Sequence, residues 1–157
     1  MKTLIVYFSY AGNTALAAEH LKAALNAETL ELKLSNEKKR TKPGKFFWAM
    51  SLMFSKKAML KPYNVDINAY DLVVLGTPVW GGHPSPVIAA FLNQTKFHGK
   101  KIALLCCHAS GPGKVFDEFT TLLPENTIIG KIDLHSPSKM QVTELKQKID
   151  EWVKLLC

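Results

Sequence analysis

Residues 3–25 read TLIVYFSYAGNTALAAEHLKAAL and contain three patterns in succession. The run Leu4–Phe8 is continuously apolar, which is typical of a strand buried on both faces of a parallel sheet. A turn of small and polar residues follows at Ser9–Thr14, and apolar residues then recur at helical spacing as far as Leu25. Because a strand, a tight polar turn and a helix in this order aim backbone N–H groups at an anion, the turn is interpreted as a phosphate-binding loop.

The side chains of this turn suit a phosphate, but they also suit an ordinary helix cap. Ser9, Asn13 and Thr14 carry hydrogen-bonding groups, and Gly12 lets the backbone approach a ligand closely. No Gly-Lys-Ser/Thr follows, which excludes a Walker loop. A single glycine is too few for the dinucleotide-binding fingerprint. The turn alone leaves both interpretations open.

The turn resembles the phosphate loop of flavodoxins, which usually reads Ser/Thr-x-Thr-Gly-Asn/Lys-Thr. Ala11 departs from that pattern and removes one expected hydroxyl group. The resemblance implies that this first loop wraps the phosphate of FMN. The residues that it assigns to FMN binding are Ser9, Tyr10, Ala11, Gly12, Asn13 and Thr14.

A second buried-strand run, Asp71–Pro78, leads into VWGGHPSP, a segment rich in glycine and proline, and then into a helix over Val87–Leu92. The segment GTPVWGG resembles the second flavin loop of flavodoxins. This implies that Trp80 stacks against one face of the flavin ring; the alternative is a tryptophan packed under its own turn. The residues assigned to this second loop are Thr77, Pro78, Val79, Trp80, Gly81 and Gly82.

A third buried run, Lys101–Cys107, enters HASGPGK and then a helix over Val115–Leu123. Its position resembles that of the third flavin loop, whose backbone meets the pyrimidine edge of the ring. His108 is either a group near the flavin N1 and O2 or a capping residue. The tyrosine that usually covers the second flavin face is missing, and His108, Phe116 or an aromatic residue of 46–54 are its alternatives. The residues assigned to this third loop are Cys107, His108, Ala109, Ser110 and Gly111.

The remaining elements complete an α/β pattern. Glu28–Leu34 alternates as a short edge strand, Asn126–Leu134 is a last short strand, and an amphipathic helix begins at Val142. Phe46–Leu60 is interpreted as a helix of three or four turns. The pattern and the resemblance predict a flavodoxin-like three-layer sandwich: one domain, 1–157, with a five-stranded parallel sheet of order 2-1-3-4-5 and helices on both faces. In that order the three loops converge on one crevice.

Composition limits the class of protein. The chain has 157 residues, 47% of them hydrophobic, and no apolar stretch approaches the roughly 20 residues that span a bilayer. Three cysteines do not make a disulfide framework, and Cys106 and Cys107 are interpreted as structural thiols, so a cytoplasmic location is expected. No nucleophile–base pair and no histidine spacing typical of a metal site is found, so neither catalytic residues nor metal ligands are assigned.

The net charge of +7 is concentrated in one segment. Residues 38–61 contain eight lysines and arginines, whereas the rest of the chain is nearly neutral. We favour a helix whose apolar face covers the sheet or the cofactor rim while its lysines are solvated and face acidic redox partners. A membrane-surface helix over 46–60 and a nucleic-acid patch are the alternatives.

The resemblance implies an FMN-binding electron-transfer protein that carries one or two electrons. An NAD(P)H-dependent FMN or quinone reductase, an oxidoreductase on the same fold, is the alternative. A third hypothesis is a binding module without flavin, anchored to a membrane or an acidic partner through 46–60.

Overall fold

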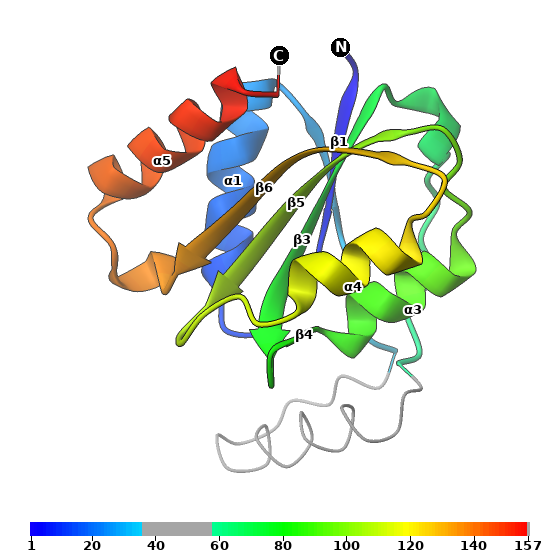
Figure 1. The fold of residues 1–157 in the computed structure, drawn as a ribbon, viewed down its shortest axis with the longest axis horizontal. Helices are drawn as coiled ribbons and strands as arrows, with labels where there is room; N and C mark the ends of the chain where they lie inside the picture. The colour runs from blue at the N-terminus through cyan, green and yellow to red at the C-terminus, as the bar shows by residue number, and fades with distance from the viewer. Residues whose placement is uncertain (36–57, 157) are drawn as a thin grey trace.

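The computed structural model describes residues 1–35 and 58–156, in which strands and helices alternate along the chain (Figure 1). The elements are β1 (Thr3–Tyr7), α1 (Asn13–Leu25), β2 (Glu28–Glu31), η1 (Ile67–Ala69), β3 (Leu72–Trp80), β4 (His83–Pro84), α3 (Pro86–Gln94), β5 (Lys101–His108), α4 (Val115–Leu122), β6 (Thr127–His135), η2 (Pro137–Lys139) and α5 (Val142–Lys154). The two η elements are single 3₁₀ turns.

Five of the strands form a parallel sheet in the order β2-β1-β3-β5-β6. This confirms the predicted fold and strand order. A sixth strand, β4, pairs with the end of β3 in the antiparallel direction. Val79 and Trp80 therefore belong to a strand and not to the turn that the glycines and prolines had suggested. They pair with Pro84 and His83, so only Gly81 and Gly82 remain as the turn of a hairpin.

The sheet is covered on both faces, which explains the uninterrupted apolar runs. Along β1, Leu4 and Val6 face the core beneath α3 and α4, whereas Ile5 and Tyr7 face the core beneath α1 and α5. Figure 1 shows the two helix pairs on opposite sides of the sheet. A strand with two buried faces has no solvent face on which polar residues would alternate.

The predicted helix over Phe46–Leu60 does not extend to its expected end. Leu60 forms an antiparallel bridge with Leu34. The Lys61 amide donates to the Lys33 carbonyl over 2.7 Å, so this stretch is extended. The rest of that helix, and most of the basic segment 38–61, lies outside the described residues.

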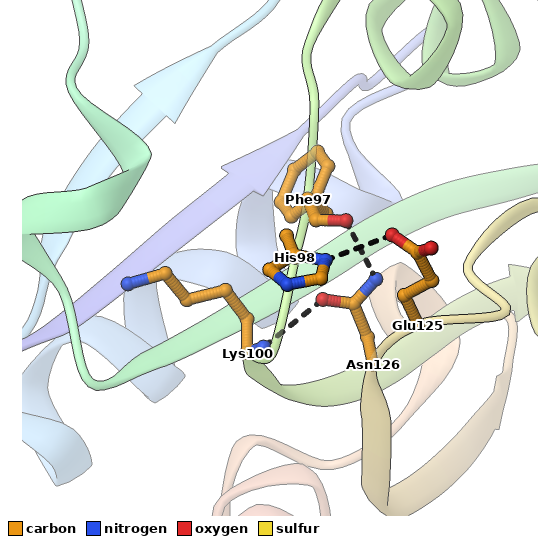
Figure 2. Close-up of polar contacts among 5 residues, drawn as sticks. All are labelled: Phe97, His98, Lys100, Glu125 and Asn126. Atoms are coloured by element: carbon orange, nitrogen blue, oxygen red, sulfur yellow. Dashed lines mark hydrogen bonds and ion pairs between the residues drawn. The ribbon is translucent and has the colours of Figure 1, made fainter.

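Side chains also tie the amino ends of β5 and β6 together (Figure 2). The Asn126 carboxamide accepts a hydrogen bond from the Lys100 amide and donates one to the Phe97 carbonyl, each over 3.0 Å. Beside them His98 Nδ1 lies 2.8 Å from Glu125 Oε2. These contacts hold the end of the sheet that is opposite the three loops of interest.

Helix α5 docks on β6 where that strand has a glycine. The pairing of β5 and β6 is irregular between Ile102 and Ala103, opposite Gly130. A Cβ atom at Gly130 would lie 2.5 Å from Leu156 Cδ2 and 3.1 Å from Trp152 Nε1. The absence of a side chain at this position therefore allows the C-terminal helix to pack directly on the strand backbone.

Candidate functional site

The first loop closes tightly against the start of α1. The Ser9 hydroxyl accepts a hydrogen bond from the Ala15 amide over 3.1 Å, and the Gly12 carbonyl accepts one from the Leu16 amide over 2.9 Å. Ser9 therefore satisfies one of the amide groups that every helix leaves unpaired at its start. Its own hydroxyl proton is not used in this contact and can still be donated to a ligand.

Thr14 is the exceptional residue of this loop. It is only 1% exposed, and its hydroxyl has no hydrogen-bond partner in the part of the chain that the structure describes. The hydroxyl lies close enough to the Cys107 thiol to lower its pKa slightly, but a thiol is a weak hydrogen-bonding group. A buried, unsatisfied hydroxyl costs free energy, so its presence here calls for a ligand or another reason.

Asn13 is used inside the protein instead. Its carboxamide oxygen accepts a hydrogen bond from the Ser138 amide over 2.8 Å. This contact ties the start of α1 to η2, the turn that follows β6. The loop after the last strand therefore supports the first loop.

In the second loop, Trp80 reaches across to the first. Its ring makes edge contacts with Phe8 and Tyr10, with ring centroids 6.1 and 5.5 Å apart. Trp80 is thus fixed by the end of β1 as well as by its own hairpin. Thr77 is fully buried; its hydroxyl accepts from the Ser85 amide and donates to the Pro78 carbonyl, each over 3.0 Å.

The second and third loops touch through their backbones. The Lys114 amide donates to the Gly82 carbonyl over 2.7 Å. A Cβ atom built on Gly113 would lie 2.4 Å from Gly82 Cα. Both loops must therefore keep glycine at this crossing, because no side chain fits between them.

His108 ends β5 with both ring nitrogens engaged. Its Nδ1 accepts a hydrogen bond from the Gly111 amide over 2.8 Å, and its Nε2 lies 2.9 Å from Asp133 Oδ2. Of the two interpretations made from the sequence, this geometry favours the capping residue over a free group pointing at a ligand.

The three loops line two adjoining cavities. The first, of about 140 Å³, is enclosed by all three loops. Its lining residues are Ser9, Tyr10, Ala11, Asn13, Thr14, Pro78, Val79, Trp80, Cys107, His108, Ala109 and Ser136. The second, of about 290 Å³, lies between the second and third loops and shares Val79, His108 and Ala109 with the first. Its other lining residues are Gly81, Gly82, Ser110, Gly111 and Gly113.

The ionisable side chains in these cavities are uncharged near neutral pH apart from His108. Burial raises the pKa of the Cys107 thiol to about 12, as it does that of Cys106, and burial also raises the pKa of Tyr10. Both cysteines are free and buried. Among residues 1–35 and 58–156, no group of three His, Cys, Asp or Glu side chains is arranged to hold a metal ion. Nor does any helix in these ranges have the length and apolarity to cross a membrane.

Sequence and structure comparisons identify the family. A family model described as flavodoxin matches residues 2–154, nearly the whole chain. This chain belongs to the flavodoxin family. No curated protein sequence matches it significantly.

Solved structures of flavoproteins resemble this flavodoxin closely in fold. A flavoprotein from Lactobacillus acidophilus NCFM in complex with FMN is 27% identical, with a TM-score of 0.73 over 97% of this chain and 98% of that one. The apo form of a flavoprotein from the same organism is also 27% identical, with a TM-score of 0.63 over 88% of this chain and 95% of that one. Two-electron reduced Megasphaera elsdenii flavodoxin is 20% identical, with a TM-score of 0.61 over 97% and 98% of the two chains.

Most residues that the sequence assigned to the site of this flavodoxin line one of the two cavities. Gly12 and Thr77 line neither, and the hydroxyl of Thr77 is used within the hairpin. Phe116, one alternative for the second flavin face, also lines neither. Ser136 and Gly113 line the cavities but were not assigned. The position of Ser136 at the carboxyl end of the last strand was a signal for it, because ligands of such sheets bind at that edge.

Proposed function

We propose that this flavodoxin binds FMN in the three-loop site and carries electrons, one or two at a time, between partner proteins. The observation that supports FMN most directly is the buried Thr14 hydroxyl without a partner, at the start of α1 and on the wall of the cavity. Helix N-termini favour anions, and a phosphate oxygen is the acceptor that this hydroxyl lacks.

The residues present fit such a cofactor. The start of α1, Ser9 and Thr14 would hold the phosphate, while Tyr10 and Trp80 would lie against the ring system. The third loop would contact the remaining ring edge through its backbone. FMN, when bound, supplies the electron-transfer chemistry, and the chain supplies binding, orientation and exclusion of water.

Replacing Thr14 by valine separates the ligand from the fold. We expect T14V to weaken FMN binding about tenfold, because a hydrogen bond to a charged group is lost. The apo protein should be as stable as the wild type or more stable, because an unsatisfied buried hydroxyl is removed. Fluorescence titration with FMN and urea unfolding of the apo protein measure the two effects.

Thr3 offers a matched control for this test. It is also buried, at 3% exposure, with an unpartnered hydroxyl, but it lies at the amino end of β1, away from the loops. T3V should therefore share the stability effect and leave FMN affinity unchanged. Equal FMN affinity in T14V and T3V would contradict the proposed phosphate site.

The carrier is favoured over a reductase because the described residues of the cavities offer little acid–base chemistry. Only Tyr10, Cys107 and His108 are ionisable there, and His108 is engaged on both nitrogens. We expect the FMN-loaded protein to oxidise NADH or NADPH, with a quinone as acceptor, no faster than free FMN at the same concentration. Saturable turnover above that control would establish the reductase instead. Acidic redox partners for segment 38–61 remain part of this proposal, on sequence charge alone.

A further inference from the structure

Two histidines stand side by side at the carboxyl end of the sheet. His108 ends β5 and His135 ends β6, and the two residues are partners in the strand register. Their rings meet edge to face, with centroids 5.7 Å apart. Both side chains reach the third loop, which lines both cavities.

The contacts of His108 define its protonation state. The Gly111 amide can only donate, so Nδ1 must carry a lone pair. The proton then resides on Nε2, which donates to the Asp133 carboxylate. The side chain is only 8% exposed, so water cannot readily replace either partner. His108 is therefore the neutral Nε2–H tautomer in this arrangement.

His135 differs in a way that matters for pH. Its Nε2 lies 2.9 Å from the Ala109 carbonyl, to which it donates. An imidazolium donates from the same nitrogen, so protonation of His135 preserves this contact. Protonation of His108 instead places an N–H at Nδ1, directly against the N–H of Gly111. Only one of the two histidines must stay neutral for the loop to keep its hydrogen bonds.

We propose that His108 is a positioning residue that holds the Gly111 peptide in the shape that FMN requires, and that its protonation releases the third loop and weakens FMN binding. This inference rests on the proposed function for its ligand. The hydrogen bond between His108 and Gly111 itself can be tested without FMN.

The groups that face His108 allow this response. On β6, Asp133 favours the imidazolium of His108, whereas a protonated His135 opposes it. Tyr10 and Cys107 share the cavity with His108, and burial raises the pKa of both. Both remain neutral between about pH 5.5 and about pH 8, where histidines titrate. Among the described residues, the change of charge beside the loop in this range therefore comes from the two histidines.

Asparagine is the informative replacement for His108. Its carboxamide oxygen lies close to the place of Nδ1 and can accept from Gly111, but it does not titrate. Leucine removes the acceptor altogether. Wild type, H108N and H108L are titrated with FMN near pH 8 and near pH 5.5. The phosphate of FMN titrates in the same way for all three proteins, so the ratio of affinities between variants isolates the contribution of His108.

We expect wild type to lose roughly fivefold more affinity than H108N between the two pH values, the effect of one buried hydrogen bond. H108L should bind roughly fivefold more weakly than wild type near pH 8 and differ little from it near pH 5.5. If H108N and wild type fall in parallel, His108 does not set the response and the proposal is overturned.

NMR of the apo protein gives an independent result. Imidazole ¹⁵N spectra should show an unprotonated Nδ1 on His108 near pH 8, and exchange of the Gly111 amide should accelerate on acidification in wild type but not in H108N. A protonated Nδ1 near pH 8, or equal exchange in both proteins, would contradict the proposal even if FMN binds. If wild type binds no FMN, the proposed function fails while these spectra still decide the role of His108.

Discussion

Replacing Gly113 by alanine should weaken FMN binding at least about a hundredfold. The added Cβ atom would lie 2.4 Å from Gly82 Cα and 2.5 Å from the Gly82 carbonyl oxygen, which are backbone atoms that cannot rotate away. Gly113 also has φ +57°, where a side chain is strained. Strain and overpacking together cost about 3 kcal/mol or more, and the second and third loops must separate to relieve them. Titration of the apo protein with FMN measures the loss.

Gly99→Ala is the matched control. Gly99 has nearly the same backbone angle, φ +62°, but a Cβ atom there would meet nothing within 4 Å. It lies in the turn before β5, at the end of the sheet opposite the loops. G99A should cost about 1–2 kcal/mol of stability through strain alone and leave FMN affinity unchanged. If G113A binds FMN as well as G99A does, the two loops are not locked together at this crossing.

Replacing Gly130 by alanine should lower the free energy of unfolding of the apo protein by about 3 kcal/mol, the upper end of the cost of overpacking a core. The new methyl group would meet Leu156 Cδ2 at 2.5 Å and the Trp152 indole at 3.1 Å. Both side chains belong to the buried core that α5 forms with the sheet, so the end of the helix must shift. Urea unfolding followed by circular dichroism measures the change.

A double variant tests this explanation. In L156A the group that clashes most closely with the new methyl is gone, so adding G130A to it should cost less than in wild type by about 1–2 kcal/mol. Additive effects would mean that α5 absorbs the methyl group without displacement. FMN affinity of the folded fraction should change little, because Gly130 lines neither cavity.

The sequence predicted the sheet well because its signal is local. Runs such as Lys101–Cys107 are apolar at every position inside, and the structure buries alternate residues of this run against different helix pairs. The β3–β4 hairpin was missed because Gly81 and Gly82, with the prolines around them, are typical of a turn. That Val79 and Trp80 continue the strand depends on their pairing partners, which single-residue preferences do not encode.

The same limit applies within the site. The backbone crossing of Gly82 and Gly113 joins two loops that no local pattern connects. The role of His108 could not be chosen from the sequence because its partner, Asp133, is on another strand. The bridge between Leu34 and Leu60 ended a helix that the apolar spacing alone would have continued. In each case a contact between distant segments decided the outcome.

The walls of the site depend on the last part of the chain to be made. Asn13, in the first loop, is held by the Ser138 amide, and the third loop is held by Asp133 and His135. A nascent chain on the ribosome has all three loops in the open before these supports emerge from the exit tunnel. Capture of FMN should therefore follow release of the finished polypeptide, and the cell's flavin supply would decide how much of this protein waits in the apo form.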